Sequence, residues 1–323
     1  METQVYAFYL RDQNDLQESS SGGAFTALSN VILEQQGTVI ACNYHYDTHE
    51  MRFDTAKDVQ LRNQMRGSKY IQANNMDLYT ELERELRKKD DAPLLVVGTP
   101  CQIAGAKAWV NYKRTLNPGK VIYCDLLCHG VSSPQMWKAY IQSQEKKYQE
   151  RIEFVTFKDK NRGWLRPVAK AKLEHGKEIA IEDYAMLYKS NDFMRASCYH
   201  CKYASVRRDT DITIGDFWGI QKIDPSFVNL GGTSLILVHT AAGKWLFEKA
   251  AGAGRIRHST IDECMQPNME YPVKPSLRFQ DIHRDYKKYG LPHIIEKYVC
   301  YGPGGKNIRR LRRKYFEMKY REN

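Results

Sequence analysis

The fold is decided by Leu94-Leu-Val-Val-Gly98 and Val121-Ile-Tyr-Cys-Asp-Leu-Leu127, two short apolar runs separated by a helix-like stretch from about Ile103 to Tyr112. Apolar runs of this length that are bounded by turn residues are typical of buried strands. Strands that alternate with helices along a chain indicate an α/β fold. The central part of this sequence therefore predicts strands inside a sheet, with a helix between them.

Working outward, the same alternation fills the first half of the chain, and a different pattern begins at Arg151. The first half predicts further helices and a strand at Ala24 to Gln36, Thr38 to Cys42, Leu78 to Lys89 and Pro134 to about Tyr148. Later runs predict shorter, antiparallel strands at Arg151 to Phe157, Pro167 to Leu173 and Glu178 to Ile181, before a helical region from about Ser276.

The predicted fold class is α/β, with a mixed sheet flanked by helices, a smaller antiparallel β portion and a C-terminal helical region. We divide the chain into an α/β part over residues 1–150, a β-rich part over 151–270 and a helical part over 271–323. With 323 residues and 42% hydrophobic content, the chain can bury a sizeable core.

The composition also bears on where the protein works. No apolar run approaches the roughly 20 residues of a membrane span, and the start Met1-Glu-Thr-Gln-Val-Tyr6 lacks the basic and apolar regions of a signal peptide. We expect a soluble, cytoplasmic protein. The net charge of +11 would suit nucleic acid, an acidic partner or a polyanionic cofactor. Much of it lies in the tail from Lys306 to Arg321, which predicts a basic amphipathic helix packed on the body, with a membrane or partner contact as the alternative.

Four of the eight cysteines form a pattern that suggests a shared site. Cys198 and Cys201 form a Cys-x-x-Cys pair, whose two thiols can grip one metal centre, and a strand ending at Gly215-Asp216 follows. Cys101 and Cys128 each lie where a predicted buried strand meets a turn, so all four thiols can converge at one end of a sheet. The others are expected to be buried free thiols: Cys42, Cys124, Cys264 and Cys300.

Two kinds of metal centre compete for these ligands. A Cys-x-x-Cys pair is a common half of a tetrahedral zinc site, but zinc knuckles usually take their other two ligands from a second close pair. Cys101 and Cys128 stand 27 positions apart, after different strands. Scattered single cysteines are typical of an iron-sulfur cluster, where each thiolate binds its own iron. His129 and His200 lie beside these cysteines and could tune the site, although such histidines more often bond backbone or solvent.

Two other segments have the composition of anion sites. The turn Ser20-Ser21-Gly22-Gly23 opens a predicted helix, and adjacent glycines at a helix N-terminus let backbone amides approach a phosphate closely. The segment Arg66-Gly67-Ser68-Lys69-Tyr70 adds two cations and a hydroxyl. Neither matches the P-loop or the dinucleotide fingerprint, so a serine-capped helix and an ordinary basic turn remain alternatives.

Taken together, these motifs resemble the coenzyme F-420 hydrogenase/dehydrogenase beta-subunit family, which includes deazaflavin-reducing hydrogenase beta subunits and hydroxymethyl-chlorophyll reductase. The matching segments follow the family order from about Tyr6 to Gly243: Ser20 to Gly23 with Phe25, Arg66 to Tyr70, Gly98 to Ile103, Asp125 to Pro134, Gly163-Trp164, Ser197 to Lys202 and Asp211 to Gly219. The resemblance implies a flavoprotein that carries FAD and a 4Fe-4S cluster.

The resemblance also implies roles for particular residues. Cys101, Cys128, Cys198 and Cys201 become the expected cluster ligands. The turn Ser20, Ser21, Gly22, Gly23 and the segment Arg66, Gly67, Ser68, Lys69, Tyr70 become expected FAD contacts. Asp125, His129 and Asp216 lie beside the cysteine turns and are expected to position flavin or substrate, with turn capping or hydrogen bonding at strand ends an equal alternative.

One departure from the family pattern shapes the expected partners. Many members carry an N-terminal ferredoxin-like segment with two Cys-x-x-Cys-x-x-Cys runs, which is not found in this sequence. We therefore expect electrons to come from a separate ferredoxin, a donor subunit, or a reduced nicotinamide or deazaflavin, and to pass to a small-molecule substrate. A homo-oligomer is left open.

The predicted function is an iron-sulfur flavoprotein oxidoreductase that exchanges hydride with a small organic substrate. The first alternative is a zinc-knuckle protein without enzymatic activity, whose basic surface binds nucleic acid. Basic and aromatic residues do not cluster into a known nucleic-acid motif, and that alternative leaves Cys101 and Cys128 unexplained. A second alternative is a family member that keeps the fold but only docks to a partner, without turnover.

Overall fold

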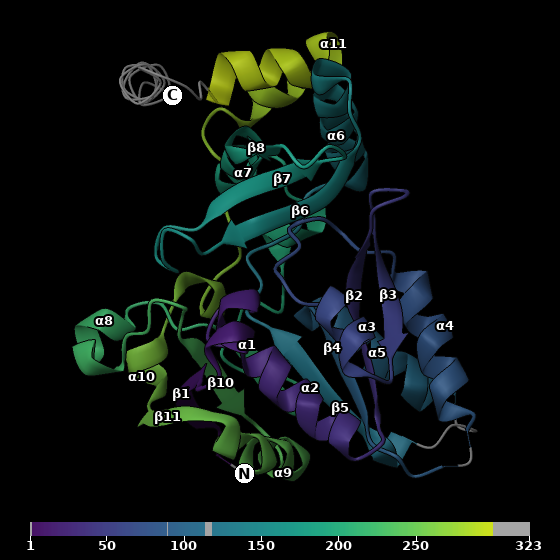
Figure 1. Cartoon of the computed structure of the whole chain (residues 1–323), viewed down its shortest axis with the longest axis vertical. Helices are drawn as coiled ribbons and strands as arrows, with labels where there is room; N and C mark the ends of the chain where they lie inside the picture. Colours follow the sequence, from purple (N-terminus) through teal and green to yellow (C-terminus); the bar gives the residue numbers. More distant parts are fainter. Residues whose placement is uncertain (1, 89, 114–117, 300–323) are drawn as a thin grey trace.

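The computed structural model describes residues 2–88, 90–113 and 118–299, which form two separate sheets (Figure 1). The larger sheet holds β1 (Gln4–Leu10), β2 (Thr38–His45), β3 (Glu50–Ala56), β4 (Leu94–Gly98), β5 (Val121–Leu126), β9 (Ile212–Asp216), β10 (Ser234–Val238) and β11 (Gly254–Ser259). The smaller sheet holds β6 (Ile152–Asp159), β7 (Val168–Leu173) and β8 (Glu178–Ala180). The tail from Lys306 to Arg321 and Cys300 lie outside the described residues.

The large sheet is mixed, in the order β11-β1-β10-β9-β5-β4-β2-β3. The four central strands β2, β4, β5 and β9 run parallel, and β3 closes one side as an antiparallel edge strand. On the other side β10 is antiparallel to β9, and β1 lies between β10 and β11. The predicted fold class is confirmed: a mixed sheet with flanking helices, a smaller antiparallel sheet and a helix near the C-terminal end.

Helices cover both faces of the large sheet, which explains why its central strands are apolar along their whole length. Successive strand residues point to opposite faces. In β4, Leu95 and Val97 join the core under α2 (Ala24–Glu34) and α9 (Ala241–Ala250). Leu94 and Val96 join the other core, with α4 (Asn75–Leu86) and α5 (Pro100–Tyr112). Strand β4 is therefore buried from end to end.

Local capping signals fix where the helices begin, and α4 and α5 each begin three residues before the predicted starts at Leu78 and about Ile103. The start of α5 has a capping box between Thr99 and Gln102, with Pro100 at the first position. Helix α6 (Pro134–Tyr148) also begins at a proline. The remaining α-helices are α1 (Gln13–Glu18), α3 (Val59–Gln64), α7 (Glu182–Lys189), α8 (Ile220–Ile223), α10 (Ile261–Cys264) and α11 (Phe279–Ile294). None of the described helices is long and apolar enough to cross a membrane.

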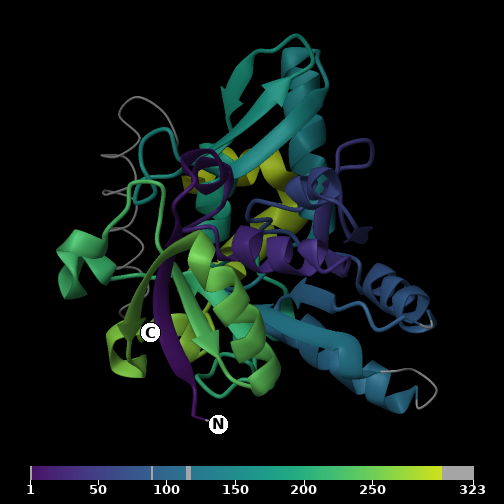
Figure 2. The ribbon, with the colours of Figure 1, turned by 60° about the horizontal axis from the view of Figure 1, so that its bottom comes forward.

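The small sheet forms a second layer with α6, α7 and α11. Figure 2 shows β6, β7 and α6 projecting from the part that holds the large sheet. Its core is aromatic: Trp137 and Tyr140 of α6 pack against Tyr184 of α7, with ring centroids 4.6 and 5.1 Å from that of Tyr184. The predicted antiparallel pairing of β6, β7 and β8 is confirmed. Residues 151–270 divide between the two sheets, because β9, β10 and β11 return to the large one.

Candidate functional site

The segments singled out in the sequence meet at one edge of the large sheet. Strands β4, β5 and β9 are parallel neighbours, so their carboxyl ends at Gly98, Leu126 and Asp216 share that edge. Strand β1 runs in the same direction as β9, since both are antiparallel to β10. Ligands of open α/β sheets bind beyond the carboxyl ends of such strands.

Cys101 lies in the first turn of α5, directly after β4. The side chains of Thr99 and Gln102 fix this turn through the capping box, and Thr99 Oγ1 lies 3.2 Å from Cys101 Sγ. The Cys101 side chain is exposed. A thiol on the first turn of a helix is held by the backbone of both the strand and the helix, so its position is well defined.

Cys128 and the Cys-x-x-Cys pair come from loops that pack on each other. Cys198 and Cys201 belong to the 3-10 turn η2 (Ala196–His200) and the residue that ends it. The loop after β5 reaches this turn through a hydrogen bond of 2.8 Å from Arg195 N to Val131 O. Gly130 has φ 136°, and a Cβ there would lie 3.0 Å from the sulfur of Met194 and 3.5 Å from Cys198 Cβ. Only glycine allows this close approach.

The four predicted ligand thiols influence one another electrostatically. Burial, with smaller contributions from the charges of Cys101, Cys198 and Cys201, raises the pKa of Cys128 to about 12. Burial also raises the pKa of Cys198, again with contributions from Cys101 and Cys201. The structure therefore brings together the thiols of three separate chain segments. Thiols with a raised pKa, such as those of Cys128 and Cys198, become ligands when a positively charged centre removes their protons.

The cysteines outside this group lie elsewhere. Cys124 in β5 and Cys264 in α10 are fully buried, which confirms two of the predicted buried thiols, and Cys42 in β2 is half-buried. Within residues 2–88, 90–113 and 118–299, no three His, Cys, Asp or Glu side chains are grouped as ligands of a single metal ion. The ligands of an iron-sulfur cluster do not surround a single ion, since each thiolate binds its own iron. Four cysteines from three segments are the donor set that such a cluster uses.

His129 and Asp125, two of the predicted positioning residues, are held by other side chains. The ring nitrogens of His129 lie 3.2 Å from Asn268 Oδ1 and 2.6 Å from Asn191 Oδ1. Asp125 is buried, accepts a 2.5 Å hydrogen bond from Thr213 and lies 3.3 Å from Arg208 Nη1. Because Arg208 follows the Cys-x-x-Cys turn, this pair ties the turn to β5.

The buried network around Asp125 extends to a histidine. Thr213 Oγ1 donates to Asp125, so His239 Nε2, 2.9 Å away, donates to Thr213, and His239 Nδ1 accepts from Thr3 at 3.1 Å. Burial raises the pKa of Asp125 to about 6, although Arg208 and Thr213 lower it. Burial and Arg208 lower the pKa of His239 to about 4.

Asp216, the third predicted positioning residue, anchors a second polar cluster at the carboxyl end of β9. It forms an ion pair with Lys158 at the end of β6, and Trp164 Nε1 lies 3.3 Å from its other oxygen. Burial works against both charges, but Lys158 lowers the pKa of Asp216, and Tyr70 and Asp216 raise the pKa of Lys158. Ser21 Oγ donates to Thr233 O at 3.0 Å, and Ser21 also lowers the pKa of Asp216. The charges of Asp216 and Lys158 thus lie near both Ser21 and Tyr70.

The turn Ser20 to Gly23 is held tightly against the sheet. Gly22 O accepts a 2.9 Å hydrogen bond from Leu10 N, and a Cβ on Gly22 would lie 2.2 Å from Phe8 O and 2.5 Å from Ser234 N. Gly23 caps α2 with φ 86°, the left-handed region that glycine tolerates. Both glycines are required here by the backbone, and the half-buried Ser20 precedes them.

The segment Arg66 to Tyr70 follows α3 and is largely occupied by its own contacts. Lys69 Nζ folds back onto the carbonyls of Met65 and Arg66, each at 2.9 Å, where it caps the end of α3. Gly67 has φ 87° and faces open space, and Ser68 is half-buried. The ring of Tyr70 stacks on that of Tyr188 at 4.4 Å. Tyr188 donates a 3.0 Å hydrogen bond to Gly130 O, which links this segment to the cysteine loops.

A cavity of about 510 Å³ opens beside the Ser20 to Gly23 turn. Its buried floor is Lys160, which donates to the carbonyls of Leu16, Ser21 and Gly231. Burial, and then the charge of Lys158, lowers the pKa of Lys160 to about 8. Arg162 and Asn229 line the opening. Gly163, which precedes Trp164 of the Asp216 cluster in the chain, also lines the cavity.

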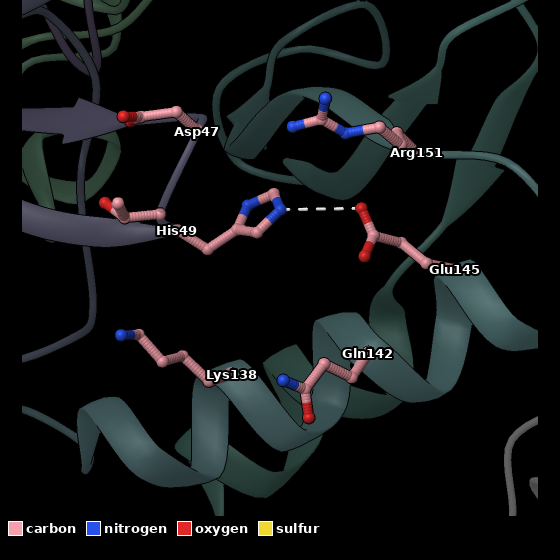
Figure 3. A pocket seen from close by; sticks show the side chains of 7 residues that line it. Asp47, His49, Lys138, Gln142, Glu145 and Arg151 are labelled. Atoms are coloured by element: carbon pink, nitrogen blue, oxygen red, sulfur yellow. Dashed lines mark ion pairs between the residues drawn. The ribbon is translucent and has the colours of Figure 1, made fainter.

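A second cavity, of about 250 Å³, lies between the β2–β3 turn and α6 and contains none of the predicted site residues (Figure 3). His49 Nε2 lies 3.5 Å from Glu145 Oε1, and Figure 3 shows Lys138 and Arg151 on either side of this pair. Tyr44 accepts from Trp137 Nε1 and so donates to His49 Nδ1 at 2.8 Å. Glu50 neutralises Lys138, so the charges around this cavity are largely balanced.

Fold and site together define an α/β protein whose thiols gather at the carboxyl edge of a mixed sheet, an arrangement suited to a redox centre. A family model that describes the C terminus of the coenzyme F420 hydrogenase/dehydrogenase beta subunit matches residues 91–264. The chain belongs to this family, which confirms the predicted resemblance. Membership indicates an oxidoreductase with a role in electron transfer.

A solved structure has a similar fold. It is a chain of the F420-reducing [NiFe] hydrogenase complex from Methanosarcina barkeri, in a xenon-derivatised form. The match covers 91% of this chain and 92% of that chain, with 17% sequence identity and a TM-score of 0.54. At this identity the likeness shows the fold alone. No curated protein matches the sequence.

Several residues of the site carry no signal that the sequence analysis could use. Lys158 and Lys160 lie in Phe157-Lys-Asp-Lys160, which has the composition of an exposed strand end. Arg208 is one of two adjacent arginines. Long-range contacts bury the side chains of Lys160 and Arg208 and leave that of Lys158 only 16% exposed, and local sequence contains no information on such contacts.

Proposed function

We propose that this protein is an iron-sulfur flavoprotein oxidoreductase, in which Cys101, Cys128, Cys198 and Cys201 hold a 4Fe-4S cluster. The observation that carries the proposal is that thiols from three chain segments act on one another at the edge where β4 and β5 end. Four free thiols that form no disulfide bonds contribute little to the stability of the fold. Together, however, they supply the four ligands that a 4Fe-4S cluster needs.

We further propose that FAD binds beside this centre, between the turn Ser20 to Gly23 and the segment Arg66 to Tyr70. Two chains of contacts that join these segments support the proposal: one runs through Lys158 and Asp216, the other through Asp15 and Ser19. When bound, FAD exchanges two electrons as hydride and the cluster carries electrons singly. The donor would be an iron-sulfur protein, a deazaflavin or a nicotinamide, and the acceptor a small organic molecule.

The residues around this site would act by position and charge. Lys158 stays protonated, because its raised pKa lies far above neutral pH, and it supplies a fixed positive charge beside Tyr70. Asp216 fixes the Lys158 side chain, and Trp164 Nε1 donates to the other oxygen of Asp216. Arg208 and Asp125 hold the Cys-x-x-Cys turn against β5. The cavity above Lys160 is where a substrate would reach the site.

The test is an anaerobic visible spectrum, with iron, sulfide, zinc and flavin analysis on the same sample. We expect flavin bands, and broad cluster absorption that bleaches on reduction, with about four irons per chain. A colourless protein that holds one zinc would overturn the proposal and restore the zinc-knuckle alternative. Cofactors without turnover on any donor would leave the docking alternative.

A further inference from the structure

Two arginines at and beyond the end of α3 are buried next to each other without enough negative charge around them. Arg62 is fully buried, and the side chain of Arg66 is 8% exposed. Guanidinium groups remain charged in proteins, so their burial is costly unless each nitrogen is paired. The hydrogen-bond partners of the two guanidinium groups, and the nitrogens left without one, therefore indicate what kind of ligand binds there.

The two guanidinium groups belong to one hydrogen-bonded cluster that includes the start of α2. Arg62 Nη1 donates to Thr26 O at 2.9 Å and to Ser29 Oγ at 2.5 Å. Arg66 Nη2 donates to Asp15 Oδ1 at 2.6 Å. Ser19 Oγ connects the two sides, at 2.7 Å from Asp15 O and 2.9 Å from Thr26 Oγ1. The cluster thus runs along the first two turns of α2 and the turn before it.

Two buried guanidinium nitrogens in this cluster have no hydrogen-bond partner among the described residues: Arg62 Nη2 and Arg66 Nε. Within the described part of the chain the charges are also unbalanced, because Asp15 is the carboxylate that pairs with Arg66 and none pairs with Arg62. Burial, and then the charge of Arg66, lowers the pKa of Arg62 to about 10, and Asp15 offsets this only in part. An anion between the two groups would satisfy both nitrogens and neutralise the excess charge.

The neighbouring helix favours an anion at the same place. Helix α2 has 11 residues, and its first-turn amides have no carbonyl partner within the helix. Its Gly23 cap has no side chain to accept from them, and the amide of Ala24 donates instead to Ser234 Oγ at 3.4 Å. Amides at a helix N-terminus and pairs of guanidinium groups both bind phosphate in proteins.

We infer that Arg62 and Arg66 form a two-arginine anion site beside the N-terminal turns of α2, and that this site takes a phosphate group of the nucleotide cofactor. The identity of the ligand rests on the proposed function, whereas the anion site does not. Arg62 is then a binding residue, and bracing α2 against α3 is only part of its role.

The test uses the full-length protein freed of flavin, with inorganic pyrophosphate as the probe. Thermal unfolding is followed over a pyrophosphate titration at constant ionic strength, and FAD affinity is measured by fluorescence quenching. The variants are Arg62→Lys, Arg62→Gln and Asp15→Asn. Arg87→Gln is the control, because Arg87 is 62% exposed and pairs with Glu83 on the surface of α4.

We expect pyrophosphate to raise the unfolding temperature of the unmodified protein and of Arg87→Gln equally. Arg62→Gln should lose at least about tenfold in affinity for pyrophosphate and for FAD, which is about 1.4 kcal/mol. Arg62→Lys should lose less, because it keeps the charge but not the fork of donors. Asp15→Asn should bind pyrophosphate more tightly, because the anion no longer competes with a carboxylate.

The outcomes separate the anion site from the flavin. A folded Arg62→Gln protein with unchanged affinity for both ligands would overturn the inference, even if FAD binds. Pyrophosphate binding without any FAD binding would support the anion site and count against the flavin. If neither Arg62 variant folds, Asp15→Asn decides, and unchanged or weaker pyrophosphate binding by that variant would overturn the inference.

Discussion

The two sheets of this protein are built by the same rules but contribute to the site in different ways. In the large sheet, β4 and β10 are buried along their whole length because helices cover both faces. In the small sheet, burial alternates: only the middle residue of β8 is buried, and Phe154 of β6 is 47% exposed. A strand that is buried on both faces can present chemistry only at its ends.

This difference explains where the candidate site residues lie. The large sheet supplies Cys101, Cys128 and Asp216 from the ends of three parallel strands. The small sheet supplies Lys158 and Lys160 from the end of β6, which reaches back to the large one. The large sheet therefore positions the cysteines and Asp216, and the small sheet contributes the positively charged lysines.

The largest expected effect is at a strand end of the large sheet. Cys128→Ala should lose the cluster, with iron and sulfide reduced at least tenfold, because a 4Fe-4S cluster needs four ligands. Cys124→Ala, four residues earlier and inside β5, should keep iron and sulfide and lose only about 1 kcal/mol of stability. Metal analysis and urea unfolding of both variants make the comparison. Equal iron in the two would refute a ligand role for Cys128.

The next effect tests the contact between the sheets. Lys158→Met should lower the free energy of unfolding by about 3 kcal/mol, because it leaves the carboxylate of Asp216, whose side chain is only 17% exposed, without its cationic partner. The double variant Lys158→Met with Asp216→Asn should recover part of this loss, since the uncompensated charge is gone. Urea unfolding of the three proteins measures the coupling. A loss below about 0.5 kcal/mol in the single variant would mean that water already solvates this pair.

A smaller effect concerns pH and the network under the cysteine loops. The raised pKa of Asp125 means that stability falls as pH rises from about 4 to 6, by about 1 to 3 kcal/mol. The lowered pKa of His239 has the opposite sign: stability is lost as pH falls from 6.5 towards 4. In the unmodified protein, the contributions of Asp125 and His239 to the change of stability with pH therefore have opposite signs.

Each single variant should therefore show the pH dependence of stability that comes from the remaining group. Asp125→Asn should become more stable as pH rises between 4 and 6.5, relative to the unmodified protein, and His239→Gln should become less stable over the same range. Urea unfolding at half-unit pH steps measures both slopes. Parallel pH profiles for all three proteins would contradict the opposed titration.

The smallest effect belongs to the outer face of the small sheet. Glu178 is 58% exposed and pairs with Lys170 at 2.9 Å, so Glu178→Gln should cost at most about 1 kcal/mol. Its iron, sulfide and flavin contents should match those of the unmodified protein. A loss of cofactor in this variant would mean that the small sheet supports the site through more than the end of β6.

Much of the fold could be predicted because its signals are local. The apolar run of β4, the proline start of α6, and the alternation in β7 each report the environment of their own segment. The gathering of Cys101 and Cys128 also follows from local signals, since each ends a buried strand. The network around Asp125 could not be predicted, because Arg208 lies 83 residues away in the chain, and His239, which bonds Thr213, follows β10.

By itself, the sequence determined the class of the fold, the placement of most helices and strands, and the set of thiols that a metal centre would use. Only the tertiary structure decided that β1 lies between β10 and β11, that Lys158 meets Asp216, and that Arg62 is buried beside Arg66. The physical reason is the range of the interactions. Periodicity and capping act over one or two turns of chain, whereas a buried charge depends on segments that only the assembled core brings together.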